Sequence, residues 1–371
     1  MTTRASRPSI PNLAGKALTV NGPVDPSGLG STIMHEHLFI DFWRDKTAAF
    51  NQAVTETALW DDHLTLENLH LAQDRKPIKD EYMLADVPTA IREAAEFRKW
   101  GGDTIVDVTS IGLGRDPLAL RQVANATGLN IVMGAGWYQR FYHPPDMDRR
   151  TVEDLTDEII RDIVVGVNNT GVRSGIIGEV GINGRPITPN EEKSIRASAR
   201  ASRASGAAIS FHAGGWYREK LRVAAMVGEE GGDLNRTIFG HSNSYAGDVP
   251  FLLELLKLGA YVQFDSLGRA VAAVAQRPAE PGPNIGGPQV ATDALVVEAI
   301  PQLIAAGHED RLLLSQDVCM KHHLKAYGGT GYSFVMEKVL PELRQHGVTA
   351  AQINKMMVEN PRRVLTFVAP K

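Results

Sequence analysis

The chain has 371 residues, of which 43% are hydrophobic and 22% charged, and its formal net charge is −4. This composition is typical of a globular enzyme or binding protein, and it lacks the basic excess that nucleic-acid binding requires. A single cysteine excludes an internal disulfide framework and any cysteine-rich zinc motif, so a metal site must rest on histidines and carboxylates. No apolar run is long enough for a signal peptide or a membrane helix. We therefore expect a cytoplasmic protein with no nucleic-acid or membrane partner.

Short apolar, β-rich runs recur along the chain, and each is followed by a longer amphipathic segment. This alternation predicts parallel βαβ units and, with eight of them, an α/β barrel. The runs lie at residues 32–37, 103–110, 130–137, 175–181, 207–213, 237–242, 260–266 and 311–317. Helix signals lie between them. In one segment Thr188 is the expected N-cap, Pro189 the first helical residue and Glu191 the capping-box partner, and Gly206 ends the helix.

Two stretches interrupt this rhythm. Residues 42–81 separate the first run from the next helix, and residues 273–289 are rich in Pro, Gly and Ala. We expect both to be long strand-to-helix loops at the C-terminal face of the barrel, where they shape the substrate side. No repeat or linker divides the chain, so residues 1–16 are expected to form an N-terminal extension and residues 17–371 a single domain.

Histidines and carboxylates occur at or near the C-terminal ends of five of these runs. Because the parallel strands of a barrel end at one mouth, residues far apart in sequence are expected to meet there. In a strand, residues i and i+2 share a face, so both histidines of the first run should point into the barrel. Six such side chains exceed one tetrahedral site and fit two ions bridged by a carboxylate and a solvent hydroxide. The candidate ligands are His35, His37, Glu179, His212, His241 and Asp317.

Other motifs are incomplete. The stretch GAGWYQ begins like a dinucleotide-binding loop, but Gln139 stands where the third glycine is needed. GHSNS resembles a nucleophile elbow except for Ser244 in place of its last glycine. Cys319 is expected to be a buried small side chain rather than a nucleophile. Arg115 and Asp116 are expected to fix their loop by pairing with each other.

Seven stretches together identify a family: GSTIMHEHLFID, GGDTIVDVTSIGLGRD, GVRSGIIGEVG, GAYVQFDSLGR, LLLSQDV, LKAYGGTGY and ENPRRVL. They resemble the phosphotriesterase-related branch of the amidohydrolase superfamily, over most of the chain. The resemblance implies a distorted TIM (β/α)8 barrel with a binuclear centre of divalent ions, Zn²⁺ first and Mn²⁺ or Co²⁺ as alternatives. It also implies that His35, His37 and Asp317 hold the more buried ion, and His212 and His241 the more exposed one. Such proteins often dimerise, so we expect a homodimer.

The bridging position departs from the organophosphate hydrolases of that family. They carry a carboxylated lysine at the end of the fourth strand, whereas this chain has Glu179 there. In this it resembles the phosphotriesterase homology proteins, which are associated with lactones, phosphorylated sugar lactones and other carboxyl derivatives. Part of that subgroup has two phosphate-binding arginines after the last-strand aspartate, where this chain has Met320 and Lys321. Only one cation is left there for a phosphate.

The sequence therefore predicts a binuclear metal-dependent hydrolase that attacks a lactone or another carboxylic ester with a metal-bridging hydroxide. Asp317 is the expected proton carrier. An amidase or phosphoester hydrolase on the same centre is one alternative, and a barrel that binds a small molecule without turnover is another. Arg269 and the basic stretch 321–325 could bind an anionic substituent of the substrate, and a merely solvated loop is the equal alternative for them, as core packing is for Trp137. The expected contacts with the small-molecule substrate come from loop residues. They are Trp137, Tyr138, Arg269 and Lys321.

Overall fold

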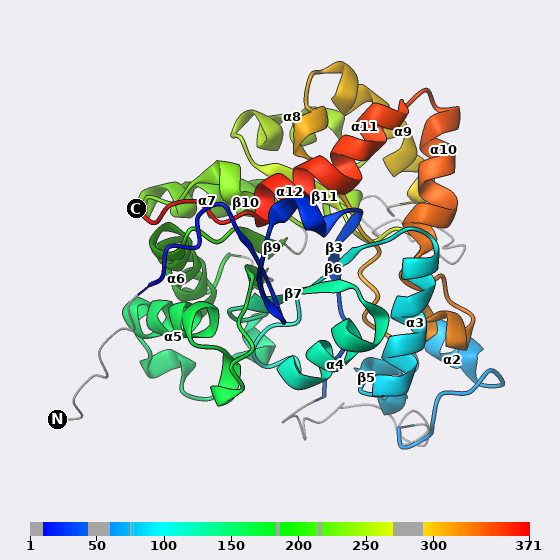
Figure 1. Ribbon diagram of the computed structural model, residues 1–371, viewed down its shortest axis with the longest axis horizontal. Helices are drawn as coiled ribbons and strands as arrows, with labels where there is room; N and C mark the ends of the chain where they lie inside the picture. The colour runs from blue at the N-terminus through cyan, green and yellow to red at the C-terminus, as the bar shows by residue number, and fades with distance from the viewer. Residues whose placement is uncertain are drawn as a thin grey trace.

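Eight parallel strands form one sheet, and each lies within one of the predicted runs, except that the fourth strand ends one residue beyond its run, at Ile182. The computed structural model describes residues 10–43, 60–74, 76, 78–182, 186–213, 217–269 and 292–371. The strands are β3 (Thr32–Glu36), β6 (Thr104–Asp107), β7 (Asn130–Ala135), β8 (Ile176–Ile182), β9 (Ile209–Ala213), β10 (Thr237–Phe239), β11 (Tyr261–Phe264) and β12 (Leu312–Leu314). The sheet curves into a nearly closed barrel inside a ring of helices (Figure 1). The predicted (β/α)8 fold is confirmed.

Helices follow the strands around the outside of the barrel (Figure 1). They are α2 (Leu69–Gln73), α3 (Val87–Lys99), α4 (Pro117–Thr127), α5 (Val152–Val164), α6 (Pro189–Ser205), α7 (Tyr217–Glu229), α8 (Val249–Lys257), α9 (Asp293–Ala305), α10 (Leu340–Gln345), α11 (Ala350–Asn354) and α12 (Asn360–Leu365). Helix α6 has the predicted ends, with a capping box between Thr188 and Glu191 and a left-handed Gly206 at φ 81°. No helix in the described part of the chain is long and apolar enough to cross a membrane.

The first and last strands of the barrel meet at a seam that a buried carboxylate holds. Glu36 accepts hydrogen bonds from Ser315 Oγ at 2.6 Å and from the backbone N–H groups of Gln316 and Val318, both at 2.8 Å. Burial raises the pKa of Glu36 to about 7, although these donors oppose the shift. No regular ladder joins β3 to β12 among the described strands. The hydrogen bonds of Glu36 therefore join β3 to the segment after β12 in place of a regular backbone ladder.

Smaller elements close the two ends of the barrel. The hairpin of β1 (Ala17–Thr19) and β2 (Gly22–Val24) lies at the start of β7, where Val20 N–H donates to the carbonyl of Ile131 at 2.9 Å. After β3, strand β4 (Ile40–Asp41) pairs with β5 (Met83–Leu84). The predicted loop 42–81 contains α2, but its residues 44–59, 75 and 77 lie outside the described residues. The predicted loop 273–289 and residues 1–9 of the predicted extension also lie outside them.

A register shift in β3 determines which way the first candidate ligand points. Met34 belongs to an apolar cluster to which all eight strand segments contribute, so this side chain lies inside the barrel. Regular alternation would then turn His35 outward. The ladder with β6 shifts between Ile33 and Glu36, and this irregularity lets His35 also face the interior. A second shift lies around Glu179 in β8.

The loop after β6 is fixed by contacts that differ from the prediction. Arg115 donates to the carboxylate of Asp162 at 2.8 Å and to the carbonyl of Gly134 at 2.7 Å. Asp116 is instead the N-cap of α4 and accepts from the N–H of Leu118 at 3.1 Å. The expected pair between Arg115 and Asp116 is therefore wrong, because each side chain has another partner that ties the loop to a helix.

Candidate metal centre

Four of the predicted ligands form a compact buried group at the mouth of the barrel. His35 Nε2 lies 3.3 Å from Glu179 Oε2, and His37 Nε2 lies 3.5 Å from Glu179 Oε1 and 3.3 Å from Asp317 Oδ1. Ligand atoms about 2.1 Å from a tetrahedral zinc ion are about 3.4 Å from one another. His35 Nε2 is buried and has no hydrogen-bond partner among the described residues. Both observations fit a divalent cation held by this group, and its role as a metal site remains a prediction.

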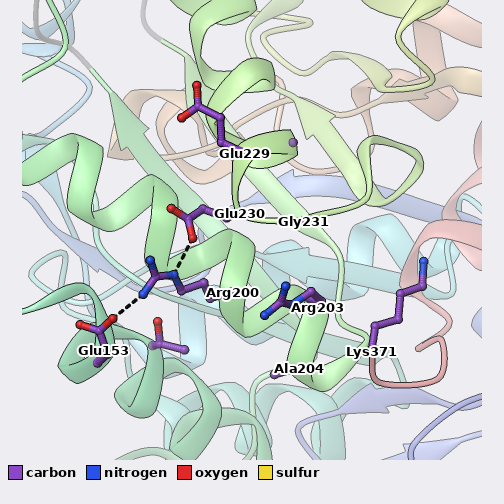
Figure 2. Close-up of a pocket in the computed structure, with 10 residues that line it drawn as sticks. Glu153, Arg200, Arg203, Ala204, Glu229, Glu230, Gly231 and Lys371 are labelled. Carbon is purple, nitrogen blue, oxygen red and sulfur yellow. Dashed lines mark hydrogen bonds and ion pairs between the residues drawn. The ribbon is translucent and has the colours of Figure 1, made fainter.

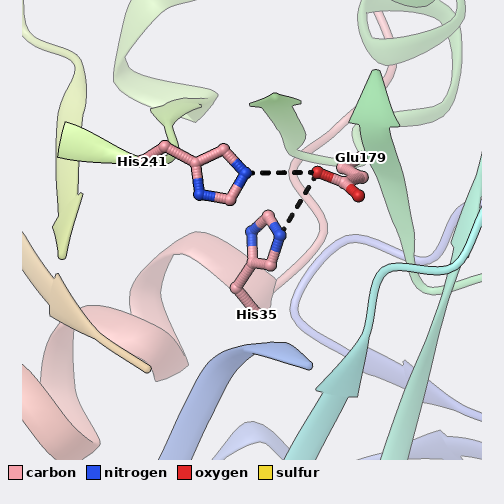
Figure 3. A group of neighbouring side chains, drawn as sticks. All are labelled: His35, Glu179 and His241. Carbon is pink, nitrogen blue, oxygen red and sulfur yellow. Dashed lines mark ion pairs between the residues drawn. The ribbon is translucent and has the colours of Figure 1, made fainter. Parts of the chain in front are cut away.

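The other two predicted ligands complete the cluster on its solvent side. His212 Nδ1 lies 2.7 Å from Glu179 Oε2 and 2.7 Å from His241 Nε2, while His241 Nε2 is 3.7 Å from Glu179 (Figure 3). The side chains of His212 and His241 are 14% and 16% exposed, against 0% for His35. This difference agrees with the expected buried and exposed halves. Distances of 2.7 Å are hydrogen-bond lengths, so a second cation would need these rings to move slightly apart.

Asp265 is a site residue that the sequence analysis missed. Its carboxylate lies 2.8 Å from His241 Nδ1 and 3.3 Å from His35 Nδ1, and it accepts the backbone N–H of His241 at 3.0 Å. Gln263 Nε2 donates to the same carboxylate at 2.8 Å. A carboxylate on the far nitrogen of a metal-binding histidine fixes the ring and its tautomer. Asp265 follows β11 and ends an apolar run, which is the signal that pointed to Asp317.

A second missed group supports His37. Thr109 Oγ1 lies 2.8 Å from His37 Nδ1, which leaves Nε2 to face the cluster. Asp107 holds this corner by accepting from the N–H groups of Thr109 at 3.0 Å and Leu38 at 2.7 Å. Burial raises the pKa of Asp107, and His37 and these donors partly offset it. His37 is thus oriented from outside the cluster in the same manner as His241.

The electrostatic field in the cluster favours positive charge. Burial alone lowers the pKa of His35, but the carboxylates of Asp265 and Glu179 outweigh burial and raise that pKa to about 9. The pKa of His241 rises to about 10 against the same effect of burial, chiefly because of Asp265. Nearby carboxylates that stabilise a protonated imidazole also stabilise a metal cation in its place. The field at His35 and His241, together with the spacing, therefore suits a cation, whereas burial and the neighbouring His241 lower the pKa of His212 despite Glu179.

Asp317 lies between the cluster and an arginine. Its Oδ1 faces His37, and its Oδ2 forms an ion pair with the guanidinium of Arg269. Burial raises the pKa of Asp317, but Arg269 and the histidines outweigh it and hold that pKa well below its ordinary range. Asp317 and His241 also have left-handed backbones, with φ of 54° and 50°, which cost about 1 kcal/mol or more in residues other than glycine. Such strain is typical of functional sites.

The remaining predicted substrate residues differ in their distance from the cluster. The hydroxyl of Tyr138 lies 3.2 Å from His212 Nε2, so this residue borders the centre. The Trp137 ring is completely buried, with the guanidinium of Arg150 5.2 Å from the ring centre, so it packs in the core. Lys321 forms an ion pair of 2.6 Å with Asp80.

The basic stretch 321–325 is largely neutralised by acidic partners. In addition to the Lys321 pair, His322 pairs with Glu81 and Lys325 pairs with Glu337. These contacts tie the segment after β12 to neighbouring loops and helices. The stretch is therefore less suited to binding a substrate anion than the sequence suggested, whereas Arg269 borders the cluster.

A hollow of about 630 Å³ lies on the helical layer and not at the cluster (Figure 2). It is bordered by α5, α6, the end of α7 and the C-terminal residue, and none of the candidate ligands lines it. Arg200 crosses it and pairs with Glu153 and with Glu230, the latter at 2.6 Å. These charges satisfy one another, so nothing in this hollow indicates a bound ligand.

Comparison with known proteins agrees with the fold and identifies the family. The sequence profile of the Phosphotriesterase family matches residues 15–365. An N-acetyltaurine hydrolase from Danio rerio is 34% identical over 96% of this chain and 99% of its own length. The crystal structure of a resiniferatoxin-binding protein from Rhodobacter sphaeroides is 38% identical, with a TM-score of 0.86 and 98% of each chain covered. The phosphotriesterase homology protein from Escherichia coli, with phosphate in its active site, is 27% identical, with a TM-score of 0.73 over 91% of this chain and 99% of that one.

The resemblance seen in the sequence is thereby confirmed. The matched region includes every candidate ligand. The family match and the curated relative named for a hydrolytic activity lead to the same class of enzyme. The chain belongs to the phosphotriesterase family and is a hydrolase of that family.

Proposed function

We propose that this hydrolase acts on small carboxylic amides or esters and depends on a pair of divalent cations. The observation that carries the proposal is the buried group of His35, His37, Glu179 and Asp317, with ligand atoms 3.3 to 3.9 Å apart. Zn²⁺ is the first expectation and Mn²⁺ or Co²⁺ the alternatives, and His35, His37, Glu179, His212, His241 and Asp317 would hold the ions. When bound, such ions lower the pKa of a coordinated water and polarise a carbonyl oxygen.

Asp317 is the proposed proton carrier. Its carboxylate reaches the cluster through Oδ1 and Arg269 through Oδ2. From this position it can accept a proton from the attacking water and deliver it to the leaving group. Arg269 is the proposed contact for an anionic substituent of the substrate, because its guanidinium is 26% exposed and binds oxyanions through several N–H groups. Tyr138 is the proposed wall of the substrate site next to His212.

The curated relatives support one order for the two candidate bonds. The Danio rerio relative is named for the hydrolysis of N-acetyltaurine, an N-acyl compound, and is similar over nearly the whole chain. We therefore place the C–N bond of an N-acyl amide first. The lactone or other carboxylic ester, which the sequence analysis placed first, becomes the second candidate. Water attacks a carbonyl carbon in both, so the same residues serve either reaction.

A metal-removal experiment combined with a substrate panel tests the proposal. The protein is stripped with a chelator, its metal content is verified, and it is assayed on N-acyl aminosulfonates, lactones and aryl phosphotriesters before and after Zn²⁺, Mn²⁺ or Co²⁺ is restored. We expect activity to disappear and return with the metal, and kcat/KM to be highest for the N-acyl amides. Activity that persists without metal would overturn the proposal. A higher kcat/KM on lactones would replace the amide with the ester.

Arg269 is tested by a pair of matched substrates. Arg269→Met should raise KM about tenfold for an anionic N-acyl amide and leave KM unchanged for its neutral analogue. Arg140→Met serves as the control, because Arg140 is exposed at the same mouth and has no contact with Asp317. Equal effects on both substrates would remove the anion-binding role.

The test also needs a binding-only control. The Rhodobacter sphaeroides relative is named for binding and not for hydrolysis, and a barrel that binds without turnover was an alternative from the sequence. A single-turnover experiment with metal-loaded protein in excess over substrate separates the two. Product within one turnover supports catalysis, and substrate recovered intact after hours supports binding alone.

A further inference from the structure

We propose that Gln139 is a positioning residue that holds His212 in the tautomer needed for metal binding. The proposal rests on the metal centre proposed above and assigns a task to a residue outside the candidate ligand set. In the sequence, Gln139 stood out only because it interrupts a glycine motif. In the structure its side chain reaches the most tightly packed part of the cluster.

The two nitrogens of His212 face in different directions. Nδ1 faces the cluster, 2.7 Å from both Glu179 Oε2 and His241 Nε2. Nε2 lies 2.7 Å from the amide nitrogen of Gln139, which also donates to the Tyr138 hydroxyl at 3.2 Å, so the acceptor oxygen of Gln139 reaches His212 after a half turn of the amide. The hydroxyl of Tyr138 is 3.3 Å from Nδ1 and 3.2 Å from Nε2, so it lies off the line of either N–H bond. Gln139 is therefore the close partner of Nε2.

The requirement for this partner follows from the chemistry of imidazole. A neutral ring carries one proton, so a ring that binds a cation through Nδ1 must carry its proton on Nε2 and needs an acceptor there. The amide of Gln139 has an acceptor oxygen at one end and a donor nitrogen at the other, and a half turn exchanges them. The corresponding partner of His241 is the carboxylate of Asp265, which only accepts. His212 thus has a neutral, reversible partner where His241 has a charged, fixed one.

The backbone is built so that Gln139 can reach this position. Gly181 is the ladder neighbour of His212 in the sheet. A Cβ on Gly181 would lie 2.1 Å from the backbone nitrogen of Gln139, so only glycine lets the chain pass over β8 here. On the other side, His143 Nε2 donates to the carbonyl of Tyr138 at 2.8 Å. Gln139 is therefore held over Gly181 and directed at the next strand.

Two substitutions with opposite expectations test the role. Gln139→Glu places a fixed acceptor at Nε2, and Gln139→Leu removes both donor and acceptor at similar volume. Zinc content and affinity are measured by competition with a chromophoric chelator, and the unfolding of the metal-free proteins by urea. We expect the weaker-bound zinc equivalent to be lost at least about tenfold more easily in Gln139→Leu and held more tightly in Gln139→Glu. Arg140→Leu is the control and should match the wild type.

The outcomes separate this inference from the proposed function. A wild type that binds no zinc would overturn the metal centre and, with it, this role. A wild type that binds two zinc ions with the same affinities as both Gln139 variants would overturn this role alone. Weakening of equal size in both variants would likewise assign Gln139 to packing, because a purely structural side chain has no reason to respond in opposite directions.

Discussion

Lys220 offers a quantitative test of burial in this fold. Its side chain is completely buried, and its ammonium donates to the carbonyl of Gly240 at 2.8 Å. The rings of Phe239 and Tyr245 lie 5.8 and 5.4 Å away. Burial lowers the pKa of Lys220 from 10.5 to about 7, although the charge of Asp265 opposes the shift. The proposed perturbation is Lys220→Met, which removes the charge and keeps an unbranched side chain only one heavy atom shorter.

The sign and size of the effect follow from proton linkage. Between pH 7 and pH 10.5 the unfolded chain carries a proton on Lys220 that the folded chain has mostly released, so the stability of the wild type rises with pH. Each pH unit of such a difference is worth about 1.4 kcal/mol. Since the site is still about half protonated at pH 7, the expected gain between pH 7 and pH 9 is about 2 kcal/mol. Lys220→Met lacks this gain.

Urea unfolding of the chelated wild type and Lys220→Met at pH 7 and pH 9 measures the effect. The free energy of unfolding of the wild type minus that of the variant should increase by about 2 kcal/mol over this interval, because other titrations occur in both proteins and cancel. Lys257→Met, at an exposed position in α8, should show no such increase. A difference that is the same at both pH values would refute the argument from burial.

Three further substitutions test the proton carrier, the seam and a helix cap. Asp317→Asn should lower kcat at least about a hundredfold in steady-state assays while the melting temperature changes little, and a mild effect on kcat would exclude Asp317 as the proton carrier. Glu36→Gln should lower the free energy of unfolding by about 2 kcal/mol in urea titrations, because an amide N–H₂ would replace an acceptor facing the N–H groups of Gln316 or Val318; equal stability would show that Glu36 does not hold the seam. Thr188→Ala should cost about 1 kcal/mol in the same titration through loss of the capping box of α6, whereas an unchanged urea midpoint would argue against this cap.

The architecture could be predicted because its signals are local. A strand buried on both faces has a short, continuous apolar sequence, and each of the eight runs coincides with one strand to within a residue at the C-terminal end of β8. The ends of α6 could be predicted for the same reason, since a capping box and a C-terminal glycine act within one turn of the backbone that they stabilise. The loop at Arg115 was not predicted correctly, because its partner Asp162 lies on a distant helix.

The candidate site was predicted only in outline. Parallel strands end at one mouth, so carboxylates and histidines at the ends of separate runs had to meet. The same reasoning applied to Asp265 would have found it, since this residue also ends an apolar run. Nothing in the sequence indicated a role in the site for Gln139 or Thr109, because an amide or hydroxyl beside a histidine is significant only once the two are in contact.

The sequence by itself determined the eight strand segments, the family and the set of side chains able to hold a metal. The tertiary structure decided which of them face one another. A register shift turns His35 inward after Met34, and Glu36 joins the first and last strands by hydrogen bonds. Arg269 forms an ion pair with Asp317, whereas Lys321 forms one with Asp80. These outcomes depend on the geometry and desolvation of residues brought together from distant parts of the chain, which no local pattern of polar and apolar residues specifies.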